Sequence, residues 1–167
     1  MGQAIVSWFV EIFGANIGKM IGVTVISMIP IIELRGAIPV AFALGLNWQT
    51  AVFCAIIGNI LPVPFIMLFV DRIFAFMKRH GILAKFVIKL EEKAVAKSGK
   101  VMKYQFWGLA LFVGIPLPGT GGWTGALIAS MMKMNKKDSF LSIAIGIFAA
   151  AAVVTVITYF FVGSIIK

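Results

Sequence analysis

Two long apolar stretches, residues 50–70 and 140–166, constrain the fold of this chain more than any other feature. A helix needs about 20 apolar residues to cross the hydrocarbon core of a bilayer, and both stretches reach that length. The 167-residue chain is 61% hydrophobic with a mean hydropathy of +1.05, whereas globular domains are roughly 45–50% apolar. One small core cannot bury so much apolar surface. The sequence therefore predicts an all-α integral membrane protein with a single membrane domain, 1–167.

The basic residues are concentrated in one segment. The net charge is +9, and nine of the 15 Lys and Arg residues lie between Arg72 and Lys103. Such clustering beside apolar stretches is typical of a cytoplasmic loop, not of a nucleic-acid-binding surface. We therefore predict a multi-pass protein of the plasma membrane with a cytoplasmic linker, 71–103, and no nucleic-acid partner. Within the linker, lysines at a spacing of four predict an amphipathic helix that faces anionic lipid headgroups. These are Lys85, Lys89, Lys93 and Lys97.

Two further apolar segments, 17–45 and 104–132, are interrupted by proline and glycine. Proline lacks a backbone N–H, and lipid cannot satisfy the backbone groups that a helix break leaves free. Each segment could be a re-entrant hairpin, which enters and leaves on one side, or a full kinked span. Hairpins would place Lys133, Lys136 and Lys137 in the cytoplasm, which the positive-inside rule prefers. We expect hairpins.

The first and second parts of the chain, 1–70 and 104–167, resemble each other weakly. Each has an interrupted apolar segment, a short turn that begins near an asparagine, and an apolar helix. Aligning Ile29-Pro30 with Ile115-Pro116 places Gly36 on Gly122, and a two-residue slip then places Asn47 on Asn135 and Gly58 on Gly146. With a cytoplasmic linker between them, the two repeats would be inverted, an arrangement common in secondary transporters.

The first interruption carries two charges, Glu33 and Arg35, between Pro30 and Pro39. Each charge costs about 2.5–3.5 kcal/mol at the centre of a membrane helix. We interpret Glu33 as a proton carrier and Arg35 as the binder of an anionic group, with Gly36 and Pro39 shaping the site. The alternatives are a structural Glu33–Arg35 pair, or an arginine that extends to the membrane interface.

The second interruption is rich in glycine and proline and carries no charge. Backbone amides freed near the start of a helix can hold a phosphate or carboxylate. Alternatively, Gly121 and Gly125 simply allow close helix packing. Asn59, in the preceding span, could hydrogen-bond across helices. The candidate residues of this part are Pro116, Pro118, Gly119, Thr120, Gly121, Gly122, Thr124 and Asn59.

Other motifs point away from chemistry. Gly14, Gly18 and Gly22 recur every four residues, which indicates helix packing and could form a homodimer seam. Cys54 is the single cysteine, and no Cys/His cluster or nucleophile–base set occurs. The sequence therefore predicts neither an enzyme nor a cofactor or metal site.

Two stretches resemble a known family. Glu33-Leu-Arg-Gly-Ala-Ile-Pro39 and Gly114-Ile-Pro-Leu-Pro-Gly119, followed by Thr120-Gly-Gly-Trp-Thr-Gly125, resemble the bacterial and archaeal small multidrug export protein family over nearly the whole chain. That family is similar in layout to the DedA superfamily, whose paired re-entrant hairpins are associated with lipid-phosphate transport. The resemblance implies that Glu33, Arg35 and the Pro116–Gly119 turn line one central site. DedA proteins typically carry an arginine in the second hairpin, and Gly119–Gly125 holds none.

Taken together, these features favour a small secondary transporter or exporter that forms a homodimer, is coupled to protons and moves a small amphiphilic molecule. A flippase for an anionic lipid carrier, such as a polyprenyl phosphate, is the first alternative. The second is a membrane protein that transports nothing and organises lipid or partners through the lysine stripe.

Overall fold

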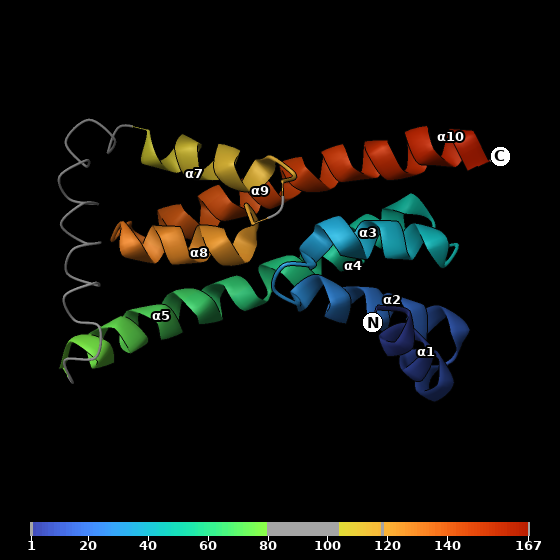
Figure 1. The fold of residues 1–167 in the computed structure, drawn as a ribbon, viewed down its shortest axis with the longest axis horizontal. Helices are drawn as coiled ribbons and strands as arrows, with labels where there is room; N and C mark the ends of the chain where they lie inside the picture. Colours follow the sequence, from blue (N-terminus) through green and yellow to red (C-terminus); the bar gives the residue numbers. More distant parts are fainter. Residues whose placement is uncertain (1, 80–103, 118, 167) are drawn as a thin grey trace.

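The computed structural model describes residues 2–79, 104–117 and 119–166, and these form helices joined by short turns (Figure 1). The first part contains α1 (Gly2–Phe13), α2 (Ala15–Met28), α3 (Glu33–Ala43), α4 (Trp48–Ile60) and α5 (Pro62–Arg79). The second part contains α7 (Gln105–Gly114), α8 (Gly122–Met131) and α9 (Lys136–Thr155). A π-helix, η1 (Val156–Val162), and the short α10 (Gly163–Ile166) continue α9. The predicted lysine stripe, Lys85 to Lys97, lies outside the described residues.

Both predicted helix breaks are confirmed. α2 ends at Met28 and α3 begins at Glu33, and α7 ends at Gly114 before α8 begins at Gly122. Pro39, however, does not interrupt a helix, because α3 continues through it. Proline removes one backbone hydrogen bond and crowds the preceding turn, but the rest of α3 stays helical. The first break is therefore confined to the four residues before Glu33.

The broken segments fold into two helical hairpins whose turns meet near the middle of the molecule (Figure 1). α2 packs on α3, and α7 packs on α8. α9 and its continuation run along the length of the molecule, beside α7 at one end and α3 toward the other. α8 contacts both α5 and α9, so this helix of the second hairpin lies between them. This arrangement brings residues about ninety positions apart in the chain into one cluster.

Two helices of the described residues are long and apolar enough to cross a membrane. They run over Trp48–Val70, which is 23 residues long, and Lys136–Ile165, which is 30 residues long. The first bends at Leu61, between α4 and α5. Phe53, Phe65 and Phe148 are each more than half exposed. Large apolar side chains exposed in this number suit contact with lipid rather than water. The helical fold of residues 2–79, 104–117 and 119–166 fits a membrane protein.

Corresponding positions in the two parts of the chain have corresponding roles. Asn47 caps α4 by accepting a hydrogen bond from the Thr50 N–H, and Asn135 caps α9 in the same way. Gly58 packs directly on the Thr24 carbonyl of α2, while a Cβ at Gly146 would lie 2.6 Å from the Ala110 carbonyl oxygen of α7. Each apolar helix therefore approaches the first helix of its neighbouring hairpin through a glycine.

The glycine seam of α2 is used within the chain. A Cβ at Gly22 would lie 2.8 Å from Cγ2 of Val6 on α1, and Val6 itself is buried. Gly14 has φ +83° and forms the turn between the two helices, which favours glycine at this position. The glycine face of α2 therefore packs against α1.

Gly58→Ala is expected to lower the free energy of unfolding of the purified protein in detergent by about 1–3 kcal/mol. The added methyl group would overlap the Thr24 carbonyl oxygen, which is backbone and cannot turn aside. Gly108→Ala is the matched control, because nothing lies within 4 Å of its Cβ position on α7. The control should leave stability unchanged or raise it by up to about 1 kcal/mol. Equal unfolding temperatures for the two variants would contradict the close α2–α4 contact.

Candidate functional site

Glu33 caps a helix of the opposite hairpin. Its side chain is only 3% exposed, and its Oε1 accepts a hydrogen bond of 3.3 Å from the backbone N–H of Trp123, in the first turn of α8. A carboxylate is favoured there because the first amides of a helix have no partner within it and carry partial positive charge. Glu33, which belongs to the first hairpin, therefore accepts a hydrogen bond from a backbone amide that the break in the second segment leaves free.

The backbone around Glu33 is held in an uncommon conformation. Glu33 has φ +48° and Ile31 has φ +78°, in the left-handed region that side chains rarely adopt. A β-branched residue such as Ile31 is particularly disfavoured there. Strained backbone of this kind persists only where surrounding contacts determine it, and such contacts cluster at binding sites. Here the strained turn points Glu33 toward α8.

Arg35 performs the complementary role at the other side of the second break. Its Nη2 group donates to Thr120 Oγ1 at 2.9 Å and to the carbonyl oxygens of Ile115 and Val113 at 3.2 and 3.4 Å. The two carbonyls lie at the end of α7, where a cation is stabilised by the helix dipole. The other nitrogen, Nη1, lies 3.5 Å from Glu33 Oε2 and forms an ion pair. The Glu33–Arg35 pair thus contacts both sides of the break in the second segment: Glu33 contacts the start of α8, and Arg35 contacts the end of α7.

Trp123 makes the reverse contact. Its indole N–H donates to the carbonyl oxygen of Met28, the last residue of α2, at 3.1 Å. Each hairpin therefore supplies hydrogen bonds to the break in the other. Trp123 was not among the residues that the sequence pattern singled out. Its position directly after the glycine pair, at the start of a helix, is the signal that could have identified it.

Several buried polar atoms in this cluster lack hydrogen-bond partners among the described residues. They are Glu33 Oε2, Arg35 Nε and both amide atoms of Asn59. Asn59 is 1% exposed, and its amide lies near the Glu33 carboxylate and beside Gly122. An unsatisfied buried polar atom costs about 1–3 kcal/mol. Such a group calls for a polar ligand, a water molecule or a change of protonation.

The structure brings together only some of the predicted site residues. Glu33, Arg35, Asn59, Thr120, Gly121 and Gly122 lie in the cluster. A Cβ at Gly121 would overlap the Glu33 carboxylate, so glycine is needed there.

The remaining candidates lie around the cluster or away from it. Gly36, Pro116 and Thr124 are half-buried on α3, in the turn and on α8, Gly119 is exposed with φ +83°, and Pro118 lies outside the described residues. Pro39 is exposed on α3 and takes no part in these contacts. The contacts of the Glu33–Arg35 cluster therefore involve fewer residues than the two sequence motifs contain.

Chemically, the cluster is a buried carboxyl group and a largely buried guanidinium cation, both held by neutral donors and acceptors. The described residues contain no group of three or more His, Cys, Asp or Glu that could hold a metal ion. The arrangement places a carboxyl group beside two donors suited to anions, the guanidinium group of Arg35 and the N–H of Trp123. It offers no activated nucleophile.

Comparison with curated proteins and with solved structures gave no match. A family model described as "Putative small multi-drug export protein" matches residues 33–153, which is well over half of the chain. The match begins at Glu33, directly after the first hairpin turn, and it includes the second turn and most of the two long apolar helices. It confirms the family that the Glu33–Pro39 and Gly114–Gly125 stretches suggested. The chain belongs to the Putative small multi-drug export protein family.

Proposed function

We propose that this protein is a small secondary transporter, which exports a small amphiphilic molecule through the Glu33–Arg35 cluster. The observation that carries the proposal is the ion pair between the buried Glu33 and the largely buried Arg35, beside the buried amide of Asn59, at the point where two broken helices meet. Ionisable groups inside a membrane protein mark transport pathways by default, because their insertion is unfavourable. The family description, which refers to export, supports the same assignment.

The proposed membrane arrangement has two inverted repeats, each with a re-entrant hairpin and an apolar helix. Its support is the matching roles of Asn47 and Asn135 and of Gly58 and Gly146. With linker 71–103 at the cytoplasmic face of the plasma membrane, the two hairpins would enter from opposite sides and meet near the midplane. If the protein is a homodimer, the Gly22 face is not its seam, because α1 covers it.

Proton coupling follows from the two bonding roles of Glu33. When ionised, its carboxylate pairs with Arg35 and caps α8 through Trp123. A proton on Glu33 would weaken both contacts and leave the guanidinium group and the helix terminus available to an anionic group. A cationic substrate would instead compete with the proton for Glu33. Weaker contacts between the tips of the two hairpins would allow one repeat to rock against the other. Such rocking is how alternating access arises in inverted-repeat transporters.

A flippase for an anionic lipid carrier, such as a polyprenyl phosphate, is the second candidate. One observation favours it: Arg35 Nε is buried and has no hydrogen-bond partner among the described residues. A guanidinium group has five donors in a fixed fork that matches phosphate. A phosphate that reached the hairpin tips could accept a hydrogen bond from this Nε–H group.

The test uses proteoliposomes loaded with a pH-sensitive dye and exposed to ethidium, a cationic amphiphile, or to farnesyl phosphate, a short polyprenyl phosphate. We expect a probe-dependent change of internal pH with the wild-type chain and at least a tenfold smaller change with Glu33→Gln. Glu11→Gln is the control, because Glu11 is exposed on α1. A response to farnesyl phosphate alone would favour the flippase. Equal responses from wild type and Glu33→Gln would contradict proton coupling.

A further inference from the structure

A cavity separate from the hairpin tips lies between α5 and α9. Its volume is about 350 Å³. It is lined from α5 by Pro64, Met67 and Leu68, and from α9 by Lys136, Lys137 and Phe140. None of these residues takes part in the Glu33–Arg35 cluster. The cavity therefore calls for its own explanation.

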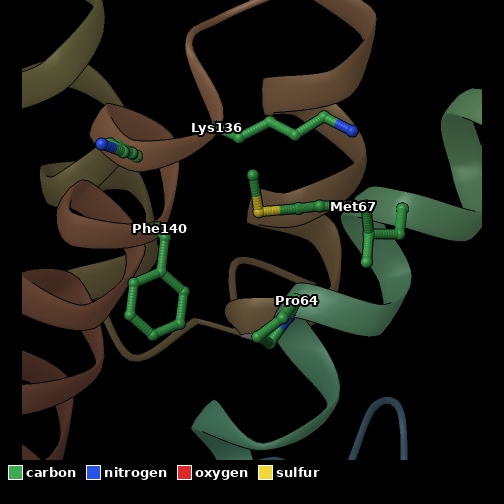
Figure 2. A pocket seen from close by; sticks show the side chains of 6 residues that line it. Pro64, Met67, Lys136 and Phe140 are labelled. Carbon is green, nitrogen blue, oxygen red and sulfur yellow. The ribbon is translucent and has the colours of Figure 1, made fainter.

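The cavity has a basic end and an apolar end. Figure 2 shows Lys136 at one end, Met67 in the middle, and Pro64 and Phe140 toward the other end. Apart from the two lysines, all the lining side chains are apolar. A ligand that matches this wall has an anionic group joined to a hydrocarbon part.

The position of the cavity along the two apolar helices agrees with its having a basic end and an apolar end. Lys136 is the first residue of the apolar helix Lys136–Ile165, and Phe140 follows one turn later, about 6 Å further along the axis. On the other wall, Pro64 and Met67 lie within the last residues of the apolar helix Trp48–Val70. Both candidate spans therefore end at the cavity. If the two candidate spans cross the bilayer, the basic end of the cavity would lie at the level of the lipid headgroups and its apolar end at the level of the acyl chains.

The surrounding charges favour an anion. The described lining contains two lysines, Lys136 and Lys137, and no acidic side chain. A second copy of this chain is a poor occupant, because the chain has six acidic residues against 15 basic ones. Basic pockets between membrane helices at the cytoplasmic side are a known mode of headgroup recognition.

We propose that this cavity binds one anionic phospholipid, with its phosphate at Lys136 and Lys137 and the start of an acyl chain against Met67 and Phe140. The lipid would contact α5, from the first part of the chain, and α9, from the second. It would therefore stabilise the contact between the two parts, and a ligand that binds only the folded state raises the unfolding temperature. This inference does not depend on the transport proposal.

The test for the headgroup measures lipid retention by native mass spectrometry of the full-length protein in detergent, titrated with phosphatidylglycerol or phosphatidylcholine. We expect tighter binding of phosphatidylglycerol and about a fivefold weaker affinity for it in Lys137→Gln, since one lysine near an anionic lipid contributes about that factor. Lys133→Gln removes the same charge from the same end of the molecule but outside the cavity lining. It should change the affinity by less than twofold.

A second pair of variants tests the apolar end. Leu68 lines the cavity and is 49% exposed, whereas its neighbour Phe69 is 57% exposed and does not line it. Leu68→Trp should reduce phosphatidylglycerol retention at least threefold by occupying the cavity, and Phe69→Trp should leave it unchanged. Four results would overturn the proposal. They are equal retention of the two lipids, equal effects of Lys133→Gln and Lys137→Gln, displacement of the lipid by millimolar inorganic phosphate, and a changed oligomeric state in place of changed lipid retention.

Discussion

Arg35→Gln should destabilise the purified protein by about 3–5 kcal/mol, the range measured when one partner of a buried ion pair is removed. Its guanidinium group holds Thr120 and the carbonyls at the end of α7, and it faces the Glu33 carboxylate. The variant would lose these hydrogen bonds and would leave a buried carboxylate without its counter-charge. The readout is the thermal unfolding midpoint in detergent, with Arg72→Gln as the control because Arg72 is exposed on α5.

A double-mutant cycle separates the ion pair from the other contacts of Arg35. Glu33→Gln combined with Arg35→Gln leaves no buried charge in the cluster, so the double variant should be less destabilised than the sum of the two single variants. The difference should exceed about 0.5 kcal/mol, as is usual for residues in direct contact. Strictly additive effects would mean that the two charges act independently, and the proposed site would then lose its central feature.

Gly121→Ala should reduce transport about 10- to 100-fold while leaving the protein folded. The new methyl group would overlap the carboxylate of Glu33, which lies at the end of a flexible side chain and can turn away. Turning away would break the hydrogen bond to the Trp123 N–H and displace the ionisable group from the place where it meets α8. Displacement of a reacting group by about 1 Å can cost 100-fold in a rate.

The measurement is the flux assay in proteoliposomes described above, with the unfolding midpoint recorded for the same preparations. Gly108→Ala serves as the control, since its Cβ would meet nothing within 4 Å. A Gly121→Ala protein with wild-type flux would mean that the Glu33 cap on α8 is not needed for transport. A Gly121→Ala protein that unfolds at a much lower temperature would mean that the cap is mainly structural.

Features that depend on a few neighbouring residues could be predicted from the sequence. The helix breaks before Glu33 and after Gly114 follow from Pro30 and Pro116, since a missing N–H acts on its own turn. Membrane character follows from the apolar stretches, because the length of a helix fixes how far it reaches. The same local reasoning failed at Pro39, where α3 continues. A single lost hydrogen bond does not end a helix that the surrounding packing supports.

The partners of the charged residues could be decided only by the tertiary structure. The sequence places Glu33 and Arg35 in one turn, and it does not say that this turn meets the start of α8 and the end of α7. Nor does it show that Trp123 closes the end of α2 or that α5 and α9 enclose a basic-ended cavity. Propensities act over a few residues, whereas these contacts join residues about ninety positions apart or helices from different parts of the chain. The packing of the helices brings the tips of the two hairpins together. Only this packing gives Glu33 and Arg35 their partners in the second hairpin and so forms the site.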